Sequence, residues 1–144
     1  MSAPTAFRTR IAVRFGDVDH AGIVYYPRYF IYFHEEFEDF FNLEGPRYAT
    51  LLDQRRIGFP TVHIDADYQA PLRYGDSLDV ALTVSKIGRS SAVFRYEGHR
   101  VSDGKLTVSA RITTVCTHLD RFESLPFPDD VRALYERFAE PQPA

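Results

Sequence analysis

Groups that cross-link a chain or bind metals are scarce in this sequence. Cys116 is its only cysteine, and tryptophan is absent. A single cysteine excludes an intrachain disulfide and is the usage expected in a reducing cytoplasm. The five histidines are scattered, and neither an H-E-x-x-H nor a C-x-x-C motif occurs. We therefore expect no metal, no cofactor, and a buried, unreactive side chain at Cys116.

Excess charge and long apolar runs are also missing. The formal net charge of −3 argues against a basic face for nucleic acids. No apolar run approaches the roughly 20 residues that cross a bilayer, and the N-terminus does not resemble a signal peptide. No repeat or linker divides the 144 residues. We expect one soluble, cytoplasmic domain with a core over residues 8–138, short terminal tails, and neither nucleic acid nor membrane as a partner.

Aromatic residues, in contrast, are abundant and regularly spaced. After Pro27, phenylalanines recur with a helical period, acidic residues fall largely between them, and Gly45-Pro46 ends the pattern. This spacing predicts an amphipathic helix of about four turns from residue 27 to residue 43. The predicted stripe consists of Phe30, Phe33, Phe37, Phe40 and Phe41, with Tyr29 beside it.

Alternating patterns predict strands in the rest of the chain. In the first of them, Ile11, Val13 and Phe15 share one side. The predicted strands are 8–15, 62–68, 78–84, 91–101 and 106–118, with short helices at 47–54 and 129–138. A turn at 102–105 and other short links indicate antiparallel neighbours. The fold class is therefore α+β, with an antiparallel sheet of about five strands wrapped around one long central helix.

The densest polar segment directly precedes that helix. Asp17, Asp19 and His20 lie in a predicted loop a few residues before the helix start. A helix start offers free N–H groups to a carbonyl oxygen that gains negative charge. A carboxylate facing it can attack a carbonyl or deprotonate a water. A thiolate leaves readily, whereas hydrolysis of an amide would need more catalytic groups. The alternative role for Asp17, Asp19 and His20 is structural, in helix capping or Asx turns.

Residues 15–27, F-G-D-V-D-H-A-G-I-V-Y-Y-P, resemble the signature of 4-hydroxybenzoyl-CoA thioesterases, in which D-x-D-x-x-G-[IV]-V-x-Y opens the long helix. The likeness extends from about Arg10 to Leu119. It includes Gly58-Phe59-Pro60, Tyr68-Gln69-Ala70-Pro71, Gly75-Asp76 and Gly88-Arg89-Ser90-Ser91. The resemblance implies a hotdog fold and the hydrolysis of an acyl-CoA thioester.

The resemblance also implies catalytic roles. The second aspartate of the motif matches Asp19, which would act as nucleophile or as general base. The N–H that polarises the carbonyl matches Tyr26, a plausible donor because Pro27 has none. Gly22 would supply a backbone conformation or a close approach to ligand. Asp17 is expected to make hydrogen bonds within the loop.

Substrate-binding residues follow from the same likeness. Tyr25, Thr61 and His63 are candidates for the acyl pocket, the last two as contributions from a neighbouring subunit. Tyr29 is expected in the core, and His34 half-buried on the helix.

The CoA phosphates call for local cations, and Lys86, Arg89, Ser90 and Ser91 are the candidates. A solvated turn is the alternative role for these four residues. His20 departs from the best-known aromatic-specific members, which have proline there; it would orient water or Asp19, or lie exposed.

The predicted function is hydrolysis of an aromatic, 4-hydroxybenzoyl-like acyl-CoA to the free acid and CoA. The alternatives are a short or branched aliphatic acyl-CoA, and a non-catalytic acyl-CoA-binding protein. A dehydratase is disfavoured, because those families place their acid–base residue in a different segment. The resemblance also implies a homo-oligomer, at least a dimer with continuous sheets and shared active sites, and a tetramer as a dimer of dimers.

Overall fold

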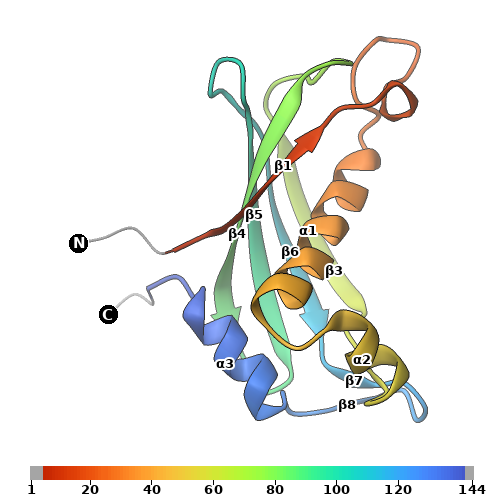
Figure 1. The fold of residues 1–144 in the computed structure, drawn as a ribbon, viewed down its shortest axis with the longest axis vertical. Helices are drawn as coiled ribbons and strands as arrows, with labels where there is room; N and C mark the ends of the chain where they lie inside the picture. The colour runs from red at the N-terminus through yellow and green to blue at the C-terminus, as the bar shows by residue number, and fades with distance from the viewer. Residues whose placement is uncertain (1–4, 142–144) are drawn as a thin grey trace.

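A five-stranded antiparallel sheet, with one long helix across one face, forms the body of the computed structural model, which describes residues 5–141 (Figure 1). The helix is α1 (Arg28–Glu44). In spatial order the strands are β1 (Phe7–Ala12), β4 (Ser77–Ile87), β5 (Ser91–Arg100), β6 (Leu106–Val115) and β3 (Thr61–Tyr68). The predicted α+β architecture is therefore confirmed.

The core is an aromatic cluster between α1 and the sheet. Phe33 stacks on Tyr96 of β5 with ring centroids 4.7 Å apart, and Phe37 meets Phe94 edge-on at 5.0 Å. Such geometries add to the stabilisation that burial of each ring provides. Most of the predicted stripe is buried, as is Tyr29. Phe30, at the margin of the stripe, is only partly buried.

Two polar residues of α1 have environments that the sequence did not predict, and the expectation for His34 was wrong. Glu36 falls on the buried side of the helix and accepts a hydrogen bond from the Thr9 hydroxyl of β1. Burial raises the pKa of Glu36 to about 8. His34, expected half-buried, has 60% of its side chain exposed and lies 3.8 Å from Glu38, one turn further along the helix. Glu36 stands three positions after Phe33 and four before Phe40, so the helical period itself places it on the buried face.

The smaller elements were predicted in part. The predicted terminal helix agrees with α3 (Asp129–Arg137) and the predicted short helix with α2 (Tyr48–Asp53), each to within one residue at its ends. Cys116, buried as expected, interrupts the predicted strand 106–118, because its N–H bonds to the Ser90 carbonyl. Two-residue strands carry too little alternation to be recognised in a sequence. These elements are α2 (Tyr48–Asp53), α3 (Asp129–Arg137), β2 (Ile57–Gly58), β7 (Thr117–His118), β8 (Glu123–Ser124) and the 3-10 turn η1 (Phe15–Asp17).

The first strand ends earlier than predicted. β1 stops at Ala12, and Phe15, expected on the buried side, is 77% exposed in η1. The chain leaves the sheet because the Arg14 N–H bonds to the carboxylate of Asp17 instead of a neighbouring strand. This turn begins the polar loop before α1.

β3 is an edge strand whose inner side is largely uncovered. Ile64 and Tyr68 pair with β6 residues that face the core, yet they are 44% and 45% exposed. The alternation predicted for this strand is present, but α1 covers its inner side only in part. One chain therefore leaves an apolar strip along a sheet edge, a feature that usually invites pairing.

No helix within residues 5–141 is long and apolar enough to span a membrane.

Candidate active site

The loop before α1 is a tight, hydrogen-bonded turn. The Asp19 N–H bonds to the Ile23 carbonyl, and the Gly22 N–H bonds to the Asp19 carbonyl, both at 3.0 Å. Gly22 has φ of +82°, a left-handed conformation that glycine adopts without steric cost. No atom lies within 4 Å of a Cβ built at Gly22. Gly22 was expected to supply either a backbone conformation or a close approach to ligand, and the described chain shows the backbone conformation.

Asp17 anchors this loop. It is 4% exposed and accepts hydrogen bonds from the Arg14 N–H at 2.9 Å and from Nε and Nη2 of Arg28 at 3.1 and 2.7 Å. Burial alone would raise the pKa of Asp17, but the hydrogen bonds from Arg14 and Arg28 hold it below its ordinary value. A carboxylate satisfied in this way holds structure, which agrees with the role expected for Asp17.

Asp19 is in the opposite situation. Its side chain is exposed, and its Oδ1 accepts the Ala21 N–H at 2.8 Å, a local turn contact that fixes the carboxylate. Within residues 5–141 its Oδ2 accepts no hydrogen bond. His20 is exposed beside it and makes no hydrogen bond to it. The loop therefore presents one oriented carboxylate oxygen to solvent.

A free donor lies at the start of α1. The N–H groups of Arg28 and Tyr29 bond to the carbonyls of Tyr25 and Tyr26, at 2.8 and 3.3 Å, and Pro27 has no N–H. Within the described part of the chain, the Tyr26 N–H donates to no acceptor. Tyr26 thus offers the unpaired backbone donor at the positive end of the helix.

A tyrosine-lined pocket adjoins Tyr26. Its volume is about 350 Å³. Tyr68, at the end of β3, lies with its ring 5.4 Å from that of Tyr29 and 6.4 Å from that of Tyr26. Tyr29 is 4% exposed, and burial raises its pKa to about 12. Tyr25 is 49% exposed and does not line this pocket. We call this space the tyrosine pocket, lined by Ile23, Val24, Tyr26, Tyr29, Tyr68, Gln69, Ala70 and Pro71.

A second pocket lies between α1 and the other half of β3. It holds about 90 Å³ and includes Thr61, as expected for an acyl pocket, but not His63. His63 pairs with Thr113, whose side chain points to the outer face of the sheet, so the structure separates the two candidates. We call this space the phenylalanine pocket, lined by Phe30, His34, Phe37, Phe59, Thr61, Ile64, Tyr96, Ile112 and Thr114.

One chain does not bring the two pockets together. Thr61 and Tyr68 are the end residues of β3, so about 23 Å of extended strand separates them. The loop with Asp19 lies at the Tyr68 end. Within one chain, Asp19 and Thr61 therefore lie at opposite ends of β3.

The CoA-binding candidates are also remote from Asp19. Lys86 is the penultimate residue of β4, Arg89 and Ser90 lie in the turn that follows, and Ser91 begins β5. This turn is at the opposite end of the sheet from the loop before α1 (Figure 1). Its backbone is tied to the C-terminal segment, since the Arg89 carbonyl accepts the Phe127 N–H at 3.0 Å. Lys86 and Arg89 are exposed.

Several site residues escaped the sequence reasoning. Arg28, which neutralises Asp17, stands eleven positions away, too far for a local pattern to reveal the pair. Asking which cation could satisfy a buried aspartate would have pointed to it. Tyr68 appeared only as part of the family likeness at the end of a predicted strand, and Thr114 lay inside another predicted strand without a signal of its own.

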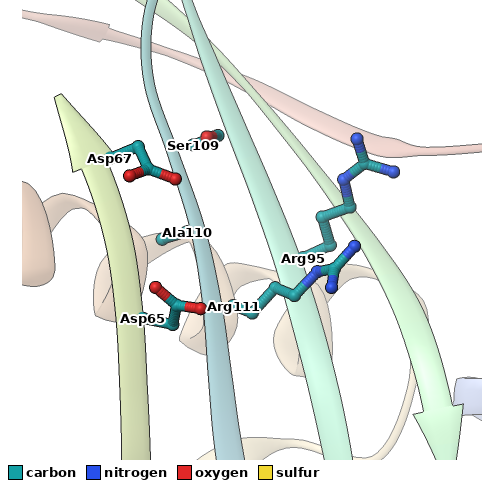
Figure 2. A pocket seen from close by; sticks show the side chains of 6 residues that line it. All are labelled: Asp65, Asp67, Arg95, Ser109, Ala110 and Arg111. Carbon is teal, nitrogen blue, oxygen red and sulfur yellow. The ribbon is translucent and has the colours of Figure 1, made fainter. Parts of the chain in front are cut away.

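A further cavity on the outer face of the sheet is separate from this site. Figure 2 shows Asp65 of β3 beside Arg111 of β6, with Asp67 nearer Ser109 and Arg95 of β5 further across the sheet. These residues line a hollow of about 180 Å³. Arg95 is already paired with carboxylates of Glu97 and Glu140 at 3.1 and 3.3 Å. No group of three or more potential metal ligands occurs among the described residues.

The sheet wrapped around one helix, with a carboxylate loop at the helix start, defines a hotdog thioesterase. The chain belongs to the thioesterase-like superfamily, whose family model matches residues 13–134. The predicted fold and the predicted class of enzyme, a CoA-thioester hydrolase, are confirmed at this level. The narrower resemblance to 4-hydroxybenzoyl-CoA thioesterases is not, because the relatives carry other substrate names.

Two curated relatives are named 1,4-dihydroxy-2-naphthoyl-CoA hydrolase. One, from Nostoc punctiforme, is 28% identical over 88% of this chain and 84% of its own length. The other, from Prochlorococcus marinus, is 35% identical, and the match spans 59% of each chain.

Solved structures agree with the fold. A 1,4-dihydroxy-2-naphthoyl-CoA thioesterase from Synechocystis has a TM-score of 0.84 at 25% identity, covering 91% of this chain and 96% of its own. A gentisyl-coenzyme A thioesterase has a TM-score of 0.79 at 27% identity, covering 87% and 98%.

Proposed function

We propose that this chain hydrolyses an aromatic acyl-CoA to the free acid and CoA, with Asp19 as the reacting carboxylate. The observation that carries the proposal is the different state of the two loop aspartates. Asp17 is buried and held by Arg28, whereas Asp19 is exposed, oriented by one N–H, and close in sequence to the unpaired N–H of Tyr26. An anchored loop that presents a single carboxylate suits attack on a carbonyl.

The reaction follows from these groups. A thioester carbonyl oxygen that accepts the Tyr26 N–H becomes more electrophilic at carbon, and the helix dipole stabilises the oxyanion. As nucleophile, the Asp19 carboxylate forms a mixed anhydride and expels CoA thiolate, and water then cleaves the anhydride. As general base, it takes a proton from water, which attacks the thioester directly. Both routes give the acid and CoA, and both require the same carboxylate.

The aromatic substrate is supported by two observations. The relatives named above are a 1,4-dihydroxy-2-naphthoyl-CoA hydrolase, a 1,4-dihydroxy-2-naphthoyl-CoA thioesterase and a gentisyl-coenzyme A thioesterase. Both candidate pockets of this chain are walled by aromatic side chains, which favour flat rings. A short or branched aliphatic acyl group is the alternative within the same chemistry.

The complete site, in this proposal, is formed by two chains joined along β3. An antiparallel pair of β3 edges places the Thr61 end of one strand beside the Tyr68 end of the other. The same two-fold relation turns the β4–β5 hairpin of one chain towards the loop with Asp19 of its neighbour. Lys86, Arg89, Ser90 and Ser91 would then serve the CoA phosphates across the interface. The uncovered strip on β3 supports this pairing.

The test is thiol release from a panel of benzoyl-, naphthoyl-, isobutyryl- and butyryl-CoA. Wild type is compared with Asp19→Ala and with Asp53→Asn, an exposed aspartate on α2 outside the site. We expect the aromatic thioesters to react fastest, Asp19→Ala to lose turnover, and Asp53→Asn to keep it. Tight binding of the panel without thiol release from wild type would instead indicate a binding protein.

A further inference from the structure

A closed ring of hydrogen bonds joins the loop before α1 to the start of that helix. The Arg28 side chain donates to Oδ1 of Asp17 from Nε at 3.1 Å and from Nη2 at 2.7 Å. The Arg28 N–H donates to the Tyr25 carbonyl at 2.8 Å, and the Tyr25 N–H donates to the Asp17 carbonyl at 2.9 Å. The ring therefore runs from the side chain of Asp17 through Arg28 and Tyr25 to the backbone of Asp17.

The two groups that the proposed reaction uses lie on different parts of this ring. Asp19 follows Asp17 by two residues, and Tyr26, which carries the unpaired N–H, stands between Tyr25 and Arg28. Within residues 5–141, no hydrogen bond joins Asp19 to Tyr26 directly. The placement of the Tyr26 N–H relative to the Asp19 carboxylate therefore depends on the ring.

Helix stability does not explain an arginine at this position. Arg28 is the first residue of α1, where the positive end of the helix dipole makes a cation unfavourable. The side chain of Asp17 is 6% exposed, and its Oδ1 lies 2.7 Å from Nη2 of Arg28. A buried carboxylate without a cation is strongly destabilised, and its charge would oppose an oxyanion at the same helix end. Arg28 therefore offsets the charge of Asp17 where the reaction needs positive potential.

We propose that Arg28 is a positioning residue for thioester hydrolysis, which fixes the Tyr26 N–H relative to the Asp19 carboxylate. This inference rests on the proposed function. Arg28 acts through Asp17 and the Tyr25 carbonyl and needs no contact with the substrate. A misplacement of about 1 Å can lower a rate by about 10²-fold. Loosening the ring should therefore lower kcat, while KM, which depends on contacts elsewhere along the acyl-CoA, should change little.

The test is the steady-state kinetics of wild type, Arg28→Gln, Arg28→Lys and Arg137→Gln with the acyl-CoA that wild type hydrolyses fastest. We expect Arg28→Gln to lower kcat by about 10–10²-fold, with KM within about threefold of wild type. Lysine keeps a cation beside Asp17 as a single flexible contact, so Arg28→Lys should fold and regain part of the lost kcat. Arg137 is the matched control, because it pairs with Glu44 at the other end of α1 at 3.1 Å. Its substitution should leave kcat unchanged.

Three results would overturn the inference and leave thioester hydrolysis intact. They are a wild-type kcat in folded Arg28→Gln, a loss confined to KM, and a loss of kcat that only matches the unfolded fraction measured by circular dichroism. If Arg28→Gln does not fold, the same comparison is made with Arg28→Lys.

Absence of thiol release by wild type with every acyl-CoA would instead count against the proposed function. Amide hydrogen exchange then decides, because the Tyr25 N–H is part of the ring. Faster exchange at Tyr25 in Arg28→Lys than in wild type supports the inference that Arg28 holds the helix start against the loop. Equal exchange rates in the two proteins overturn it.

Discussion

At the scale of single residues, two aspartates two positions apart have opposite environments. Both stand in the same motif, and the sequence alone does not show which of them is satisfied. The structure separates them, because Arg28 reaches back to Asp17 while Asp19 turns towards solvent. The distinction depends on a contact across eleven positions, which neither periodicity nor spacing encodes. The resemblance to a family assigned the roles that the residue types left open.

This difference predicts a division between stability and activity. Asp17→Asn should lower the free energy of unfolding by about 2 kcal/mol, because it weakens charge-assisted hydrogen bonds of a buried group. Asp19→Asn should change it by less than about 0.5 kcal/mol, since the side chain is exposed. Urea unfolding of both variants measures the difference. Equal losses of stability in the two variants would contradict the assigned roles.

A second prediction at this scale concerns Glu36. Its pKa is raised from 4.5 to about 8 by burial, so the folded state binds a proton that the unfolded state has lost between these pH values. Unfolding free energy should therefore fall as pH rises from about 4.5 to 8, by at most about 5 kcal/mol. Glu36→Gln should flatten this part of the profile in urea titrations at several pH values. A profile unchanged by the substitution would mean that Glu36 is ionised in the folded protein.

At the scale of elements, the helix was more predictable than the edge strand. The period of its phenylalanines located α1 to within one residue at each end, because a helix buries a stripe that the sequence displays directly. β3 was also located, but its exposure was not. Alternation tells which side of a strand is apolar and does not tell whether another element covers that side. How much of β3 stays uncovered depends on how far α1 extends over the sheet, which is a property of the tertiary structure.

The exposed strip on β3 leads to a prediction about assembly. Ile64→Lys places a charge on the apolar side of the edge and should convert the oligomer to monomers, with loss of turnover. Light scattering coupled to size exclusion measures the mass. Leu43→Lys makes the same change at an apolar residue near the end of α1, 70% exposed, and should leave assembly intact. A monomeric wild type, or an Ile64→Lys variant that still assembles, would exclude pairing through β3.

At the scale of the whole molecule, the candidate groups lie at the two ends of one sheet. The loop with Asp19 and the hairpin with Arg89 are separated by the length of β4 and β5 (Figure 1). The sequence could place Asp19 and Arg89 on loops. It could not show that these loops lie at opposite ends of the sheet, because that depends on the direction of each strand. In the proposed two-chain site, a two-fold arrangement of chains would bring them to one substrate.

Mixing two inactive variants tests that arrangement. Asp19→Ala and a Lys86→Ala/Arg89→Ala double variant should each be impaired alone. After mixed refolding, a hybrid dimer contains one site with all its groups, so activity should return to about a quarter of the wild-type value. Mixtures no more active than their components would place all the groups within one chain.

The most direct test of the central claim is the initial rate of thiol release from an aromatic acyl-CoA by wild type and Asp19→Asn at equal concentration. Asparagine keeps the shape of the side chain and removes its nucleophilic and basic character. We predict a loss of about 10²–10⁴-fold in kcat, with the unfolding transition unchanged. A folded Asp19→Asn variant that turns over within a few-fold of wild type would show that another group performs the reaction.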